Sequence, residues 1–146
     1  MKIGVTGTRN GMTDFQLDAV QQWLAAWPTP RGELHHGDCV GADAEVAAIA
    51  HHLLAYHTVC HPPVKNDLRA FFASNETREP LSYFARNRNI VNETQILMVI
   101  PGLPKTEFHA SVTGGTLYTY NYAKKQNKTR VLFYPNGEVI WENPNN

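Results

Sequence analysis

The amino-acid sequence predicts an α/β fold, a three-layer sandwich with a mostly parallel sheet and an antiparallel hairpin at its C-terminal edge. Two observations support this prediction. Short apolar segments alternate with amphipathic ones along most of the chain, which is the pattern of successive β-α-β units. Asn136-Gly137 then separates the last two apolar segments, as in a tight hairpin. The 146 residues suit one domain covering 1–146.

The N-terminal half of the chain predicts alternating strands and helices. Residues 2–6 (KIGVT) read as a short buried strand, and a helix begins at Thr13, which has capping-box spacing to Gln16. Its apolar stripe comprises Phe15, Ala19, Val20, Trp23, Leu24 and Trp27. Pro28 and Pro30 end that helix. We then expect a strand at 33–36, a glycine-containing turn at 37–43, a helix with apolar residues from 46 to 54, and a strand at 56–60.

The C-terminal half continues the alternation and completes the sheet. The expected elements are a short helix at 67–73, a loop at 74–80, a helix at 81–93, a buried strand at 95–100, a long loop at 102–113, a helix at 115–126, and strands at 130–134 and 138–141. The order implies a Rossmann-like parallel sheet with helices on both faces. We expect the last strand to lie antiparallel at the sheet edge and the tail at 143–146 to fray.

Composition limits the classes of partner and compartment. Lys+Arg and Asp+Glu both number 13, so the formal net charge is zero. A general nucleic-acid binder usually has a basic excess, so long nucleic acid is not the expected partner. Two cysteines are too few for a disulfide framework, and we see neither a signal peptide nor an apolar run that could span a membrane. We therefore expect a cytoplasmic protein without membrane association.

The loops that follow the predicted strands carry the residues expected to bind a ligand. In a parallel sheet these loops meet at one edge, where glycine permits close backbone approach and helix N-termini attract anions. The clearest loop is 113–116 (TGGT), which directly precedes a helix. The candidate residues from these loops are Gly7, Thr8, Arg9, Gly37, Asp38, Gly41, Asp43, Thr113, Gly114, Gly115 and Thr116, with Thr119 one helical turn later.

Further candidates come from the helix at 81–93. Arg86 can bind phosphate bidentately and shares a helical face with Asn89, whereas Arg88 points nearly opposite. Which of the two arginines reaches the ligand stays open. Asp38 and Glu93 are the candidate catalytic carboxylates, while Asp43 could instead cap a helix.

Several common sites are disfavoured by the sequence. Neither Gly-x-Gly-x-x-Gly after the first strand nor a Walker A motif is present, which argues against ordinary NAD binding and ATPase chemistry. The histidines show no recognised zinc spacing, so we expect no metal site and no separate cofactor. Cys39 lies near a predicted helix N-terminus that could lower its thiol pKa.

Three motifs together resemble the SLOG superfamily. They are HGDCVGAD at 36–43, RNRNIV at 86–91, and Gly114-Gly115-Thr116 before a helix. The resemblance spans roughly residues 2–134 and is greatest to the small YspA-like and YpsA-like proteins. It extends more distantly to Lonely Guy phosphoribohydrolases and to the DNA-processing protein of transformation. The resemblance implies a Rossmann-like fold, a nucleotide-type ligand and a homodimer or higher homo-oligomer.

The same resemblance leaves the activity open. Lonely Guy-type enzymes carry a catalytic Glu shortly after the glycine turn, where this chain has Leu117, Tyr118, Thr119 and Tyr120. We therefore expect binding or sensing of a nucleotide or nucleotide-derived small molecule. The alternatives are nucleotide N-glycosidase (phosphoribohydrolase) activity, which makes enzyme status uncertain, and single-stranded nucleic-acid binding through Tyr118, Tyr120 and Tyr122.

Overall fold

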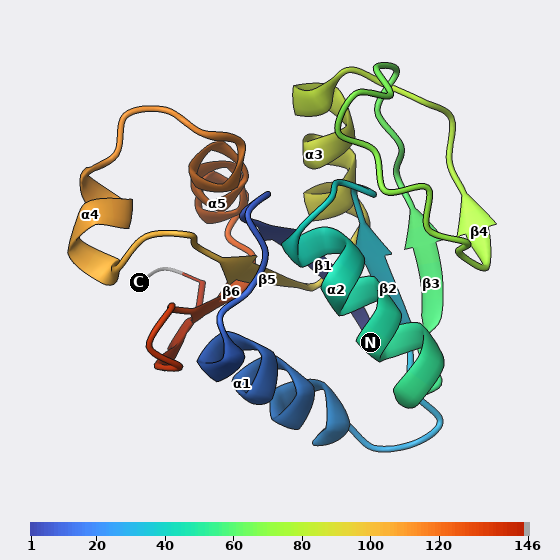
Figure 1. Ribbon diagram of the computed structural model, residues 1–146, viewed down its shortest axis with the longest axis horizontal. Helices are drawn as coiled ribbons and strands as arrows, with labels where there is room; N and C mark the ends of the chain where they lie inside the picture. Colours follow the sequence, from blue (N-terminus) through green and yellow to red (C-terminus); the bar gives the residue numbers. More distant parts are fainter. Residues whose placement is uncertain (145–146) are drawn as a thin grey trace.

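The computed structural model describes residues 1–144 and contains one seven-stranded sheet (Figure 1). The strand order is β4-β3-β2-β1-β5-β6-β7, and only the β6–β7 pair is antiparallel among the strand pairs of this described part. The strands are β1 (Lys2–Gly7), β2 (Glu33–His36), β3 (His57–Cys60), β4 (Glu76–Thr77), β5 (Ile96–Ile100), β6 (Thr129–Phe133) and β7 (Val139–Glu142). The predicted fold class is confirmed. Of the tail expected to fray, residues 145–146 lie outside the described range.

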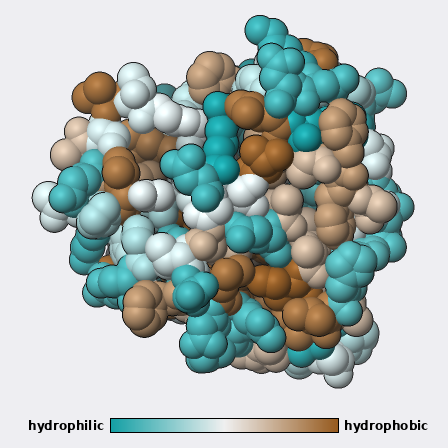
Figure 2. Space-filling view, viewed as in Figure 1, coloured by the Kyte–Doolittle hydropathy of each residue, from teal (hydrophilic) through white to brown (hydrophobic). Residues whose placement is uncertain are grey.

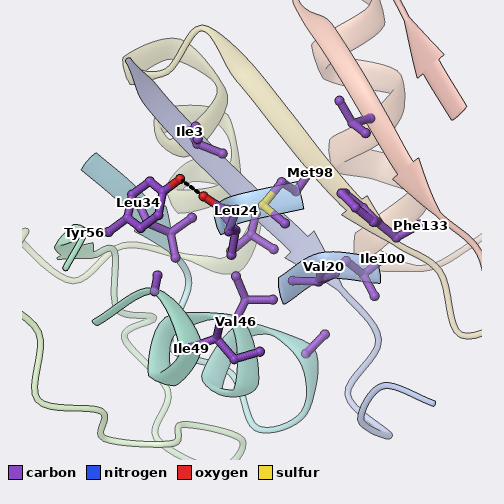
Figure 3. Close-up of a cluster of buried hydrophobic side chains, with 14 of the residues drawn as sticks. Ile3, Val20, Leu24, Leu34, Val46, Ile49, Tyr56, Met98, Ile100 and Phe133 are labelled. Atoms are coloured by element: carbon purple, nitrogen blue, oxygen red, sulfur yellow. Dashed lines mark hydrogen bonds between the residues drawn. The ribbon is translucent and has the colours of Figure 1, made fainter. Parts of the chain in front are cut away.

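Helices cover both faces of the sheet. They are α1 (Asp14–Ala25), α2 (Ala42–Ala48) with its π-helical extension η1 (Ile49–Leu53), α3 (Tyr83–Glu93), α4 (Lys105–Ala110) and α5 (Gly115–Lys125). Strand β5 shows the two-sided burial, since Met98 packs with α1 and α2 whereas Leu97 packs with α3 and α5. Figure 3 shows the first of these cores, in which the Tyr56 hydroxyl donates to the Leu24 carbonyl at 2.6 Å.

Helix α1 begins with the predicted capping box. The Thr13 hydroxyl accepts from the Gln16 amide nitrogen at 3.1 Å, and the Gln16 side chain accepts from the Thr13 amide nitrogen at 3.0 Å. The predicted apolar stripe needs one correction, because Phe15 is 69% exposed. Gln16 is buried instead, where its amide nitrogen donates to the carbonyls of Pro101 and Phe133 at the ends of two strands. Figure 2 accordingly shows polar and apolar side chains intermixed on the face that carries α1 and α2.

Two predicted segments differ from the structure. Residues 67–73 form no regular helix, because their backbone is held by the loop after β2: Val40 and Ala70 amides donate to the carbonyls of Leu68 and Asp38. The predicted loops at 74–80 and 102–113 contain β4 and α4, respectively. Helix α4 forms because Phe108 is buried against the α3–α5 side of the sheet.

The topology places the carboxyl ends of the parallel strands at one edge. The chain order reverses between β1 and β5, because β2 and β3 lie on one side of β1 while β5 and β6 lie on the other. Such a switch point is where ligands bind in open α/β sheets. Figure 1 shows this edge at the top of the molecule, where the arrowheads of β2 and β3 point. Within residues 1–144, none of the helices has the length and apolar character of a membrane span.

Candidate functional site

A cavity of about 630 Å³ lies at this edge, beyond the ends of β1 and β5. Its volume is within the range of small-molecule sites. The wall is formed by the loops after β1, β2 and β5, the first turns of α3 and the start of α5. The lining side chains include two arginines, one carboxylate and aromatic rings: Arg9, Arg86, Asp43, Tyr83, Phe84 and Phe108.

Backbone contacts fix the loops after β1 and β2 together. The Thr8 amide donates to the Ile100 carbonyl at 3.0 Å, and the Ala42 amide donates to the Thr8 carbonyl at 2.9 Å. Gly41 adopts a φ of 92°, and a Cβ added there would lie 2.5 Å from the carbonyl oxygens of Thr8 and Arg9. Only glycine allows this approach. These contacts hold the loop after β2 against the loop after β1, whose Thr8 and Arg9 line the cavity.

The start of α5 forms an open part of the wall. Gly114 has a φ of 121°, and neither it nor Gly115 has a neighbouring atom within 4 Å of an added Cβ. No side chain of residues 1–144 caps the first turn of α5. Its backbone N–H groups and the positive end of the helix dipole are therefore available to an anion. Thr113 and Thr116 line the cavity beside these groups.

Arg86 is the central buried cation of the site and is only 4% exposed. Its Nη1 donates to the carbonyls of Gly37 and of His61, the latter at 3.1 Å, and its Nη2 donates to the Cys39 Sγ at 3.1 Å. Its Nε donates to the Asn87 Oδ1 at 2.6 Å. Four of the five guanidinium N–H donors are thus used within the protein. Arg86 mainly holds the wall together and retains one donor for other partners.

Arg9 has the opposite character, because it is exposed at the mouth of the cavity. Its guanidinium carbon lies 5.6 Å from the centroid of the Tyr83 ring. An exposed guanidinium can exchange water for ligand oxygens at little desolvation cost, and the ring favours a cation above it. Of the two arginines, Arg9 is the better placed to contact a ligand in the cavity.

Asp43 is the one carboxylate on the cavity wall in the described part of the chain. It is nearly fully buried, and its Oδ2 accepts from the Cys39 amide at 3.4 Å. Burial raises the pKa of its carboxyl to about 6, although Arg86 and the amides of Cys39 and Gly37 act in the opposite direction. Burial also raises the pKa of the Cys39 thiol, contrary to the lowering expected from the sequence. Asp43 is the group able to exchange a proton near neutral pH.

The predicted residues divide into two groups in the structure. Those lining the cavity are Gly7, Thr8, Arg9, Asp43, Arg86, Thr113, Gly114, Gly115 and Thr116. Gly37 and Gly41 lie behind the wall and permit its close packing. Asn89 and Thr119 lie outside the cavity lining, and the Thr119 hydroxyl donates to the Gly115 carbonyl at 2.8 Å. Arg88 donates to the Tyr118 hydroxyl.

The carboxylates predicted as catalytic also lie outside the cavity lining. Asp38 is fully buried with a φ of 58°, and its carboxylate accepts from Arg69 Nε at 2.7 Å and from the Phe72 amide at 2.9 Å. It therefore anchors the segment after β3. Glu93 accepts from Arg78 Nη2 at 2.9 Å near the end of α3. Neither position meets the cavity.

Some lining residues were missed by sequence reasoning. Asn87 is buried on the cavity side of α3, whereas helical spacing from Arg86 had favoured Asn89. Tyr83 and Phe84 precede the arginine in the first turn of the same helix. Their aromatic character so close to the RNRN motif was the available signal. Leu103 and Phe108 could not be found in this way, because their segment was expected to be a loop.

Comparisons with known proteins identify the fold. No protein-family model matches the chain, and no curated protein matches it by sequence. Among solved structures, DNA processing protein A from Helicobacter pylori, described as binding single-stranded DNA, is similar with a TM-score of 0.63 and 16% identity over 90% of this chain. The chain spans 64% of that protein, which is less than two thirds. A molybdenum cofactor binding protein from Rippkaea orientalis gives a TM-score of 0.62 and 20% identity, covering 91% of this chain and 76% of that one. The chain thus shares the Rossmann-like α/β fold of these two proteins.

Proposed function

We propose that the chain binds a nucleotide or nucleotide-derived small molecule in the cavity at the carboxyl edge of the sheet. The observation that carries the proposal is the meeting of an uncapped helix start, an exposed arginine and aromatic rings around one cavity. Together with the HGDCVGAD, RNRNIV and Gly-Gly-Thr motifs, this arrangement supports placing the chain in the SLOG superfamily.

The start of α5 supplies the phosphate subsite in this proposal. Backbone N–H groups at 115–117 and the helix dipole favour an anion, and the Thr116 hydroxyl adds a donor. Arg9 completes the subsite from the loop after β1. Both Arg9 and the α5 start border the same cavity, so one phosphate-bearing ligand can contact both.

The first turn of α3 supplies the surface for the base. Tyr83 and Phe84 line the cavity, and the Phe84 ring lies 4.4 Å from that of Tyr118. Flat aromatic rings provide stacking surfaces that every nucleobase can use. A ligand that carries both an anionic group and a planar group therefore matches the lining of the cavity.

Calorimetric titration with nucleoside phosphates, ADP-ribose and cyclic nucleotides tests the proposal. We expect at least one to bind, and we expect Arg9→Gln to weaken that binding about tenfold or more, as loss of a charge-assisted hydrogen bond does. Arg88→Gln is the matched control, because Arg88 contacts Tyr118 rather than the cavity. Failure of every ligand to bind at millimolar concentration, or equal loss in both variants, contradicts the proposal.

Nucleotide N-glycosidase activity is the second candidate, favoured by the position of Asp43. Hydrolysis of the N-glycosidic bond joins a water oxygen to the ribose C1′ and releases the base with a proton. A carboxylate with a pKa of about 6 can accept the proton of that water near neutral pH. Asp43 has this pKa and faces the cavity.

Base release from nucleoside monophosphates tests this second candidate. Asp43→Asn should abolish release while retaining nucleotide binding, and the exposed Glu79→Gln should change neither. Asp38→Asn distinguishes the carboxylate predicted from sequence from the one in the cavity. Release that persists in Asp43→Asn would exclude Asp43 as the catalytic base.

Single-stranded nucleic-acid binding has less support than the two functions above, because the tyrosines of α5 are engaged in contacts within the protein. Tyr120 is buried and donates to Glu142, while the hydroxyls of Tyr118 and Tyr122 contact Arg88 and Asn92. An oligothymidine added to the calorimetric panel provides the direct comparison. Salt-sensitive binding of the oligonucleotide tighter than that of mononucleotides would favour this function instead.

A further inference from the structure

A second group of side chains with potential binding chemistry lies at strands β2 and β3, outside the cavity lining. It consists of His35 on β2, His61 just after β3 and Glu93 at the end of α3. Each offers one atom suited to a metal ion, and the three atoms lie within 4.8 Å of one another. Sequence spacing alone predicts no metal here, because β2 and β3 bring the histidines together from 26 residues apart.

The hydrogen bonds of the two rings leave one nitrogen poorly matched. Glu33 Oε1 lies 2.8 Å from His35 Nε2, so its carboxylate accepts a hydrogen bond from a protonated Nε2. His35 Nδ1 is then bare and must accept from His61 Nε2 at 2.8 Å. His61 Nδ1 is left with a lone pair, which faces Glu93 Oε2 at 3.9 Å. His61 is only 2% exposed and the Glu93 side chain is 34% exposed, so the two acceptors meet just beneath the protein surface.

We propose that His35, His61 and Glu93 form a binding site for a divalent transition-metal ion, with Zn²⁺ as the matching class. Two imidazoles and one carboxylate, with room for a solvent molecule, are a common zinc ligand set. His35 Nδ1 serves as the ligand because Nε2 is held by Glu33, the arrangement in which a carboxylate orients a metal-binding histidine. With the metal bound through His61 Nε2, the ring carries its proton on Nδ1, so two acceptors no longer face each other at Glu93 Oε2.

The surroundings fit an ion with small adjustments. Tetrahedral ligation with Zn–N distances of about 2.0–2.1 Å sets the ligand atoms about 3.3 Å apart. His35 Nδ1 and His61 Nε2, which are 2.8 Å apart, must therefore separate by about 0.5 Å. The Glu93 carboxylate, within 4.8 Å of the histidine ligand atoms, must move toward the ion. Arg78 occupies Glu93 Oε1 at 2.9 Å and leaves Oε2 directed toward His61.

The site connects to the cavity through the main chain. The His61 carbonyl accepts from Arg86 Nη1 at 3.1 Å, so the residue that holds the metal also holds the central arginine of the cavity wall. A bound ion would join β2, β3 and α3 behind that wall. We therefore expect the metal to stabilise the fold and to leave the cavity open for its own ligand.

Zinc titration of the chelator-treated full chain tests the proposal, with calorimetry for affinity and thermal unfolding for stability. We expect one zinc ion per chain and a rise in the unfolding temperature. His35→Gln and Glu93→Gln should each weaken binding at least 100-fold, and Glu33→Gln should weaken it about 10–100-fold, as removal of an orienting partner does. Replacing Zn²⁺ with Co²⁺ should give an absorption spectrum of nitrogen and oxygen ligation without thiolate.

Matched variants separate the proposed site from other metal-binding side chains. His57→Gln removes an exposed histidine that pairs with Glu76, and Cys60→Ser alters the neighbouring cluster of His36, Asp38 and Cys60. Both should bind zinc as the parent does. Arg78→Met removes the partner of Glu93 without removing a ligand, so it should retain binding even though it disturbs the same surface. Wild-type affinity no tighter than that of Glu93→Gln, or loss of binding in His57→Gln or Arg78→Met, overturns the proposal.

Discussion

Replacing Asp43 with asparagine should change how the stability of the fold depends on pH. Burial raises the pKa of its carboxyl from 3.8 to about 6. Between these values the folded chain holds a proton that the unfolded chain releases, so the stability contributed by this group is present below about pH 4 and is lost as the pH rises through 6. The gap of about 2.2 pH units corresponds to about 3 kcal/mol at about 1.36 kcal/mol per unit.

Urea denaturation of the wild type and of Asp43→Asn between pH 4 and 7.5, with chelator present, measures this quantity. The wild-type free energy of unfolding should fall by about 2 kcal/mol relative to that of the variant across this range, because the rest of the change of about 3 kcal/mol lies below pH 4. Burial lowers the pKa of His36 to about 4, so this residue makes the fold less stable as the pH falls. That contribution opposes the loss of stability that Asp43 causes as the pH rises, so the wild type must be compared with the variant. This contribution is common to both proteins and cancels.

The comparison also isolates the effect of burial from that of charge alone. Asp67→Asn removes an exposed carboxylate and should follow the wild type at every pH. A constant difference between the wild type and Asp43→Asn would mean that Arg86 compensates fully for the loss of hydration. In that case Asp43 would stay ionised well below neutral pH and would be a poor catalytic base.

Three further substitutions test the fold and the shape of the site by urea denaturation. Leu24→Ala empties a fully buried position in the core of Figure 3 and should cost about 2–5 kcal/mol; a cost below about 1 kcal/mol would contradict that packing. Thr13→Ala removes the cap of α1 and should cost about 1 kcal/mol, whereas Thr13→Ser should be nearly neutral. Gly41→Ala should destabilise the fold by about 1–3 kcal/mol and weaken nucleotide binding, since its Cβ meets the loop after β1; unchanged binding would show that this junction does not shape the cavity.

The parts of the fold that local pattern determines were predictable from sequence. The capping box of α1, the buried run of β5 and the Asn-Gly turn before β7 each depend on residues close together in the chain. Even β2 was found, although its polar residues His35 and His36 are fully buried in the structure. Their burial is possible because neighbouring strands and loops supply hydrogen-bond partners that sequence alone does not reveal.

Long-range contacts determine the parts that could not be predicted. The segment at 67–73 has helix-compatible residues, yet the buried carboxylate of Asp38 holds Arg69 and the Phe72 amide in an irregular path. Glu93 had no sequence signal for its pairing with Arg78. The three glycine loops were correctly expected at one edge, because a parallel sheet requires it. The sequence did not show that Asp43 rather than Asp38 lines the cavity, because that depends on the direction in which each loop presents its side chains.

The two arginines of the site differ in role because they differ in burial. Arg86 donates four hydrogen bonds, to Cys39, to Asn87 and to two carbonyls. Its removal would therefore leave buried acceptors without partners and disrupt the cavity wall. Arg9 is exposed beside Tyr83 and can be changed without that penalty. An arginine that follows a sequence motif is therefore not automatically the one that meets the ligand. Loss of binding in an Arg9 variant that keeps its fold is the more informative result about recognition.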